Sequence, residues 1–286
     1  MRQYKLLRCC RVCICGQGIK LSITMNDKGK IISRKLGELK KILFNMESVL
    51  IAYSGGVDST LLLKVAKDAL GDKVLAVIAE SEVYPSDEIT QAEKLARSLK
   101  VNYRIIKTQE LDNPKFADNP RDRCYWCKNE LFAELISIAR QNNLKHVLDG
   151  TNFDDLDDFR PGMKAADGLG IRSPLKEAMF TKGDIRFLSK QLNLSTWNKP
   201  SFACLASRFP YGSKITKEAL LRVGYAEAFL KGFGITQVRV RQYNQTARIE
   251  VLKKEIPKLL KESTRKKIVD KFKELGYIYI TVDLEG

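Results

Sequence analysis

Residues 49–65 read Val49-Leu-Ile-Ala-Tyr-Ser54-Gly-Gly-Val-Asp-Ser59-Thr-Leu-Leu-Leu-Lys-Val65, an apolar strand that enters a helix through a loop containing two glycines. Glycines let the backbone turn sharply and approach a ligand without a Cβ clash. The first amides of the helix are free to donate, and the helix dipole is positive at that end. The stretch therefore predicts a phosphate-binding loop in which Ser54 and Ser59 add hydroxyl groups. Asp58 would repel a phosphate unless it orients the loop or meets a Mg²⁺ ion that bridges the phosphates.

The loop matches neither the Walker pattern nor the dinucleotide fingerprint. It resembles the PP-loop, Ser-Gly-Gly-x-Asp-Ser, of the N-type ATP pyrophosphatases, although a serine-capped turn is the simpler alternative. That resemblance implies cleavage of ATP between its α and β phosphates, with AMP left on an acceptor oxygen. The ATP-binding residues implied are Ser54, Gly55, Gly56, Val57, Asp58, Ser59 and Thr60, with Mg²⁺.

The sequence around this loop alternates between short apolar runs and helical patterns. Buried strands are expected at Ser48–Tyr53, Val74–Ala79, Val101–Ile106 and His146–Leu148. Helices are expected at Lys35–Met46, Ser59–Leu70, Ser86–Leu99 and Lys128–Asn142. Strands separated by helices indicate right-handed crossovers and a doubly wound parallel α/β sheet, with ligands beyond the carboxyl ends of the strands.

The pattern changes after Cys204 and predicts a smaller α+β domain. Two helices are expected at Lys217–Lys231 and Lys258–Leu275, and three strands at Gln237–Gln242, Ala247–Leu252 and Tyr277–Val282. The link Asn244-Gln245 suits a hairpin turn, so an antiparallel sheet with helices on one face is expected. The resulting division is an extension over residues 1–24, a PP-loop domain over 25–205 and a substrate or oligomerisation domain over 206–286.

The composition is that of an ordinary globular protein with a formal net charge of +16. Such a surplus favours phosphate or carboxylate partners and would also suit RNA, but a solvated lysine-rich surface explains it equally well. No apolar run is long enough to cross a bilayer and no secretory signal is present, so a cytoplasmic location is expected. Residues 1–24 are basic and contain Cys9, Cys10, Cys13 and Cys15. They are either a small metal-binding appendage or a poorly structured extension, and we favour the extension.

A second ligand loop is predicted after the strand at residues 146–148. The segment Asp149-Gly150-Thr151-Asn152 lies where a parallel sheet of this kind places ligand contacts, and in the resembled superfamily it helps to enclose the nucleotide. An acidic run follows, which is either a solvated loop or a contributor to a Mg²⁺ site. Its members are Asp154, Asp155, Asp157 and Asp158.

Three cysteines in the body of the chain could do chemistry. Cys124 and Cys127 are three residues apart at a helix start, a spacing that lets both thiols bind one metal, although two incidental cysteines are also possible. The helix N-terminus, Arg121 and Arg123 are expected to lower the thiol pKa values. With Cys204, the pair could hold an iron–sulfur cluster that has one open iron, or zinc. Alternatively Cys204 acts alone as a nucleophile whose thiolate Arg208 would favour, or is simply a buried apolar side chain.

Several motifs in order point to one family. They are residues 54–60, Arg-Cys-Tyr-x-Cys-Lys (123–128), residues 149–152, Arg-Pro-Gly (160–162), Arg-Ser-Pro-Leu (172–175), Lys-Pro-x-x-x-Cys-Leu-Ala-Ser-Arg (199–208), Val-Arg-Val-Arg (238–241) and Ala-Arg-Ile-Glu (247–250). From about residue 35 onward the chain resembles the LarE-type sulfur transferases of nickel-pincer nucleotide biosynthesis. The family usually continues past the last strand with a glycine- and arginine-bearing tail, whereas this sequence stops at Gly286.

The resemblance implies a substrate and specific residue roles. The substrate is a pyridinium dicarboxylate mononucleotide, of which one carboxylate is adenylated and then receives sulfur. Cys204 occupies the position of the sulfur-donating cysteine; together with Cys124 and Cys127 it implies a 4Fe–4S cluster fed by hydrosulfide or another sulfur source. Glu227, Arg239 and Arg241 fall where the second domain reaches the active site, and Arg208 is a further substrate contact. The two arginines on one strand could also be an ordinary exposed basic strand. Relatives form homo-oligomers, so a homo-oligomer is expected.

Two other functions fit parts of the sequence. A tRNA-thiolating enzyme shares the PP-loop and often three cysteines, but nucleic acid is not otherwise indicated. An amide-forming relative would leave Cys204 and the cysteine pair without a role. A non-catalytic nucleotide- or metal-binding protein would not need so complete a loop.

Overall fold

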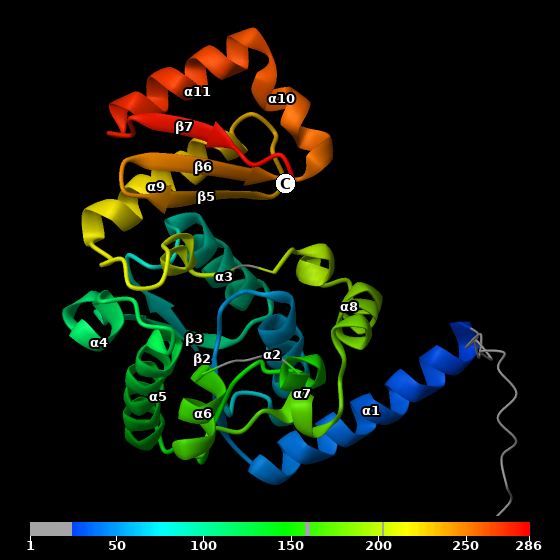
Figure 1. The fold of residues 1–286 in the computed structure, drawn as a ribbon. Helices are drawn as coiled ribbons and strands as arrows, with labels where there is room; N and C mark the ends of the chain where they lie inside the picture. Colours follow the sequence, from blue (N-terminus) through cyan, green and yellow to red (C-terminus); the bar gives the residue numbers. More distant parts are fainter. Residues whose placement is uncertain (1–24, 158–160, 202) are drawn as a thin grey trace, which may run out of the picture.

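A four-stranded parallel sheet organises the larger part of the chain in the computed structural model, which describes residues 25–157, 161–201 and 203–286 (Figure 1). The strand order is β3-β2-β1-β4. The strands are β1 (Val49–Ala52), β2 (Val74–Glu80), β3 (Asn102–Lys107) and β4 (His146–Leu148). All four agree with the sequence expectation to within two residues at either end. Residues 1–24, with their four cysteines, and Asp158 lie outside the described part.

Helices cover both faces of this sheet. One face carries a buried cluster that includes Leu61, Leu62 and Ile89. The helices that contribute side chains to it are α1 (Met25–Met46), α2 (Val57–Leu70), α3 (Ser86–Ser98), α7 (Pro174–Glu177) and α8 (Lys182–Gln191). The opposite cluster contains Phe132 and Ala166, from α5 (Arg123–Gln141) and α6 (Pro161–Gly168). The predicted doubly wound α/β architecture is confirmed.

Helix α1 starts at Met25, ten residues before the predicted start at Lys35. The apolar stripe that buries Leu39 and Leu43 extends one more turn toward the N-terminus, where Ile32 is also buried in the same cluster. Because that turn is otherwise polar, the sequence pattern gave no reason to extend the helix.

The second part of the chain is a three-stranded sheet with its own core. The strand order is β5 (Val238–Tyr243), β6 (Thr246–Val251) and β7 (Tyr279–Val282). Its core includes Val240, Ile249 and Phe272, and the helices beside it are α9 (Lys217–Lys231), α10 (Ile256–Leu260) and α11 (Glu262–Glu274). The structure thus confirms the smaller α+β domain, with three strands and helices beside them.

Two details of this part differ from the sequence expectation. The sheet is mixed, since β5 and β6 form an antiparallel hairpin whereas β6 and β7 are parallel. The intervening helices return the chain to the end of the sheet at which β6 begins. Such a crossover makes the next strand parallel. The single helix expected over 258–275 is two helices, because Lys261 has an extended backbone (φ −58°, ψ 129°).

The remaining helical segments are short connections. They are η1 (Glu110–Asp112), α4 (Pro114–Ala117), η2 (Phe153–Asp157), η3 (Ser195–Asn198), η4 (Leu205–Arg208) and η5 (Lys253–Glu255). Within the described ranges, we find no helix with the length and apolar character needed to cross a membrane.

Candidate active site

The loop after β1 requires glycine at its tightest point. Gly55 has φ +67°, and a Cβ there would lie 2.8 Å from the Cβ of Ala92 in α3. Gly56 caps the N-terminus of α2 with an extended backbone. The loop therefore lies at the carboxyl end of β1, directly before the first turn of a helix and packed against a second helix. That arrangement leaves an anion site at the start of α2.

The hydroxyl groups of the loop divide between its surface and the core. Ser54 is exposed, and its Oγ lies 3.1 Å from the Oγ of Ser59. Thr60 is fully buried, with its hydroxyl 3.2 Å from the Tyr53 hydroxyl. Ser54 and the backbone of the loop can thus face a ligand, whereas Thr60 and Val57 hold the loop to the core.

The second predicted loop lies against the first. A Cβ on Gly150 would be 3.1 Å from the amide nitrogen and 3.2 Å from the Cα of Ser59. Asp149 keeps this loop in place by accepting hydrogen bonds from Thr151 Oγ1 (2.7 Å) and Ser173 Oγ (2.7 Å). Asn152 is buried and accepts a bond from the Asp154 amide. Two segments almost a hundred residues apart in sequence thus form one site.

Asp58 is paired with a cation that the sequence analysis missed. Its Oδ2 accepts a hydrogen bond from Lys182 Nζ at the first residue of α8. Burial raises the pKa of Asp58, Lys182 opposes this effect, and the nearby Asp155 raises the pKa further. Its other oxygen, Oδ1, is buried and has no hydrogen-bond partner among the described residues. A buried carboxylate oxygen beside a phosphate loop is a ligand that fits Mg²⁺.

A second lysine, Lys199, also reaches the loop. Its Nζ donates to Gly55 O (3.2 Å) and forms an ion pair with Glu88 Oε2 (2.7 Å). Both lysines lie far from residues 54–60 in sequence. Lys199 belongs to the motif that contains Cys204, which was its only sequence signal. Lys182 had no sequence signal, because no helix was expected at residues 182–191.

A pocket lies next to the loop. Its polar lining residues include Ser54 at the loop, Tyr84 and Lys128. The wall is otherwise mainly apolar and comes from β1, β2, α3 and α5: Ala52, Val77, Ile78, Ala79, Ile89, Ala92, Leu131 and Leu135. Pockets with apolar walls and a few polar groups are typical of small-molecule sites.

The three predicted cysteines lie around Tyr84. Cys127 and Cys204 both pack against the apolar cluster that includes Val83 and Leu205, and Tyr84 packs there too. Cys124 is exposed at the start of α5. Burial raises the pKa of Tyr84 well above its usual value, and the charges of Cys127 and Cys204 act in the same direction. The shared packing of Cys127 and Cys204 shows that the structure brings the two cysteine segments together.

The expectation that the thiol pKa values are lowered is wrong for Cys127 and Cys204. Burial raises the pKa of Cys127 to about 12, helped by Glu110. Burial also raises the pKa of Cys204, against the opposing charges of Arg123 and Arg208. Removal of the sulfur atoms from water outweighs the nearby cations, so both groups are protonated thiols in the metal-free chain.

The donor atoms suit an iron–sulfur cluster, but their arrangement is not that of a ligand set. Three thiols in one region are the chemistry that such a cluster requires. In the parts of the chain that the structure describes, however, no three Cys, His, Asp or Glu side chains are grouped closely enough to hold a metal. Cluster binding would therefore require the three thiol side chains to move closer to one another.

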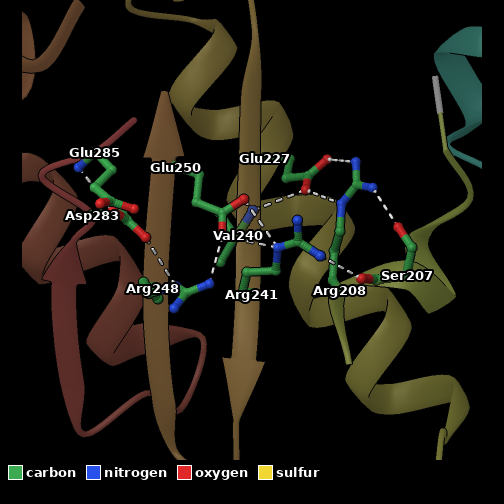
Figure 2. A network of polar contacts seen from close by, with 9 residues as sticks. All are labelled: Ser207, Arg208, Glu227, Val240, Arg241, Arg248, Glu250, Asp283 and Glu285. Atoms are coloured by element: carbon green, nitrogen blue, oxygen red, sulfur yellow. Dashed lines mark hydrogen bonds and ion pairs between the residues drawn. The ribbon is translucent and has the colours of Figure 1, made fainter. Parts of the chain in front are cut away.

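The candidate residues of the second domain form a polar network at its junction with η4 (Figure 2). Arg208 Nε donates to Glu227 Oε1 (2.7 Å), both side chains are nearly fully buried, and the same oxygen accepts a bond from the Val240 amide. Arg241 bonds to Glu250 and to the carbonyl oxygen of Ser207 (2.7 Å). The pair Arg208–Glu227 thus joins the segment after Cys204 to α9 and β5.

Arg239 differs from its neighbours in this network. It is half-buried on the same strand as Arg241 and lies across from Glu250 in the β5–β6 register. The structure gives its guanidinium no hydrogen bond or ion pair with any described residue. The proposed contacts of these residues with a substrate stay predictions: Arg208, Arg239, Arg241 and Glu227. Of the three arginines, Arg239 is the one whose guanidinium is not already paired with a carboxylate of a described residue.

Comparison with known proteins gives consistent matches. The NAD synthase family model matches residues 33–124, which contain the phosphate loop. The pyridinium-3,5-bisthiocarboxylic acid mononucleotide synthase of Lactiplantibacillus plantarum is 38% identical over 256 residues, covering 89% of this chain and 92% of that protein. An uncharacterized protein of Synechocystis is 42% identical, covering 90% of this chain and 96% of its own length. An uncharacterized protein of Methanocaldococcus jannaschii is 31% identical, covering 89% and 98% respectively.

Replacing Gly150 with alanine tests the contact between the two loops. The added Cβ meets backbone atoms of Ser59 that cannot rotate away, so the loops must separate. We expect ATP affinity to fall roughly tenfold, equivalent to about 1.4 kcal/mol, as measured by equilibrium dialysis. Gly168→Ala is the matched control because a Cβ there has nothing within 4 Å. Equal affinities for both variants would contradict this account of the site.

The raised pKa of Cys127 predicts a pH dependence of its alkylation. Only the thiolate reacts with iodoacetamide, and the thiolate fraction of a group with a pKa near 12 rises about tenfold per pH unit below that value. In protein stripped of metal by a chelator, alkylation of Cys127 should therefore keep accelerating from pH 8 to pH 11. A rate that levels off near pH 9, measured by peptide mass spectrometry, would show that burial does not control this thiol.

Proposed function

Since the chain belongs to the LarE-type sulfur transferases, a family of ATP-using PP-loop enzymes, we propose that it adenylates one carboxylate of a pyridinium dicarboxylate mononucleotide and converts it to a thiocarboxylate. The reaction would serve nickel-pincer nucleotide biosynthesis. Support comes from the relative named as the synthase of the bisthiocarboxylic product, which aligns along nearly the whole chain.

One structural observation carries this proposal. Ser54 of the phosphate loop and Tyr84 line one pocket, and Tyr84 packs against the same apolar cluster as Cys127 and Cys204. An adenylating enzyme without sulfur chemistry would have no need for thiols beside its nucleotide pocket. A metal-storage protein would have no need for the phosphate loop.

In the first step, the loop binds ATP and a substrate carboxylate oxygen attacks the α-phosphorus. The bond from the α-phosphorus to the bridging oxygen breaks, pyrophosphate leaves with its electrons, and an acyl-adenylate forms. The free amides at the start of α2 and the ammonium of Lys182 stabilise the charge on the phosphates. Mg²⁺ on Asp58 Oδ1 would neutralise the leaving pyrophosphate.

In the second step, a sulfur nucleophile attacks the acyl carbon and expels AMP. Two sources remain open. Cys204 could form a thioester, after which loss of its Cα proton to a base and cleavage of its Cβ–S bond would release the thiocarboxylate and leave dehydroalanine. Alternatively Cys124, Cys127 and Cys204 would hold a 4Fe–4S cluster, at which hydrosulfide from an external source would be the nucleophile, so that the protein would not be consumed. In both cases the mainly apolar wall of the pocket would limit hydrolysis of the adenylate by water.

Separate variants should divide the two steps. Asp58→Asn removes the charge that meets Mg²⁺ and Lys182, so ATP–pyrophosphate exchange should fall at least about 100-fold. Cys204→Ala should retain exchange yet form no thiocarboxylate. Asp68→Asn is the control, because Asp68 also pairs with a lysine but lies exposed on α2. Loss of exchange in Cys204→Ala would contradict this division of labour.

Iron and acid-labile sulfide content should separate the two sulfur sources. If the three cysteines hold a cluster, anaerobically purified protein should contain about four irons and four sulfides per chain, and Cys124→Ala should lose them. Protein without iron would contradict the cluster. Cys204 would then be the donor, and a loss of mass at Cys204 after one turnover should accompany it.

A further inference from the structure

Lys199 joins three separate segments of the site. Its ammonium contacts the carbonyl oxygen of Gly55 in the phosphate loop (3.2 Å) and the Glu88 carboxylate in α3 (2.7 Å). The side chains of Lys199 and Glu88 are each 17% exposed, so water screens this pair only partly. The contact ties the segment that leads to Cys204 directly to the nucleotide loop.

The chain between Lys199 and Cys204 is short. Five residues can span at most about 18 Å, so the position of Lys199 limits where the thiol can lie. A second anchor follows immediately, since the Leu205 amide donates to Val83 O (2.9 Å) in the connection from β2 to α3. Cys204 is thus held between one anchor on the phosphate loop and one beside Tyr84.

The first of these anchors, the contact of Lys199 with the phosphate loop, lies where the charge of a bound nucleotide would act on it. Glu88 lines the same pocket as Ser54, and its partner Lys199 contacts the carbonyl oxygen of Gly55 in the loop. A triphosphate at the loop attracts the Lys199 ammonium and repels the Glu88 carboxylate, and such effects are stronger at partly buried sites than in bulk water. The second anchor is a neutral backbone hydrogen bond and does not sense this charge.

We propose that Lys199 is a positioning residue through which ATP at the phosphate loop holds Cys204 in place for sulfur transfer. With ATP bound, the lysine is held by the phosphates as well as by Gly55 O, and the segment that ends at Cys204 becomes less mobile. The thiol is therefore presented when the adenylate can form. This inference rests on the ATP site of the proposed function.

Hydrogen–deuterium exchange over residues 200–208 tests the coupling in the full-length protein. The probe is Mg²⁺ with α,β-methylene ATP, which the enzyme cannot cleave. We expect the nucleotide to slow exchange in this segment about fivefold or more in the unmodified protein. Lys199→Gln should bind the probe more weakly, so it is compared at a probe concentration that equilibrium dialysis shows to be saturating, where it should lose the slowing; Lys199→Arg should keep part of it.

Lys35→Gln is the matched control. Lys35 also joins a carboxylate, Asp184 (2.6 Å), to a backbone carbonyl, Met179 O (2.7 Å), with similar exposure, but between α1 and α8. It should retain the full effect of the nucleotide. An undiminished slowing in Lys199→Gln would overturn the inference, because shielding by the bound nucleotide alone would then explain it. The inference would also be overturned if the unmodified protein bound the probe without any slowing of exchange at residues 200–208.

A second variant covers the case in which Lys199→Gln cannot bind the probe. Glu88→Gln releases one partner of Lys199, so exchange at residues 200–208 should be faster without nucleotide and should slow when the probe binds. Exchange equal to that of the unmodified protein in both states would overturn the inference. Failure of the proposed function looks different: the unmodified protein would then show no ATP–pyrophosphate exchange, whatever happens at this segment.

Discussion

Close backbone packing at the carboxyl edge of the parallel sheet is the constraint on which the rest of the site depends. Gly55 lies against Ala92 and Gly150 lies against Ser59, and neither position has room for a side chain. These two contacts place the loop after β1 beside the loop after β4. The start of α2 is thereby left with its amides directed at one place, which is the physical basis of an anion site.

Cations from distant segments complete this edge. Lys182 comes from α8 and Lys199 from the segment before Cys204, so the charge at the loop depends on the whole larger domain being folded. Lys199 also connects phosphate chemistry to sulfur chemistry, because the same segment continues to the thiol. The buried pair Arg208–Glu227 then links that segment to the second domain. One stretch of about ten residues therefore contacts every part of the site.

Much of this could be predicted from sequence, because strand and helix periodicity and the glycine loop are local signals. The four parallel strands and the two loops after β1 and β4 followed from such patterns, whereas a cluster held by three cysteines stays a prediction. Lys182 and Lys199 were missed because a lysine becomes a site residue only through contacts distant in sequence. The thiol pKa values were misjudged for a related reason: helix termini and arginines are visible in sequence, whereas burial of Cys127 is not. The break at Lys261 depends on one backbone torsion that no residue type demanded.

In the proposed function, one site both adenylates a carboxylate and delivers sulfur to it. The most direct test is a single-turnover incubation of the purified protein with ATP, Mg²⁺, a sulfide source and the pyridinium dicarboxylate mononucleotide, followed by mass spectrometry of the nucleotide. Formation of the thiocarboxylate together with an equal amount of AMP is the predicted result. Release of AMP with the carboxylate returned unchanged would contradict the central claim.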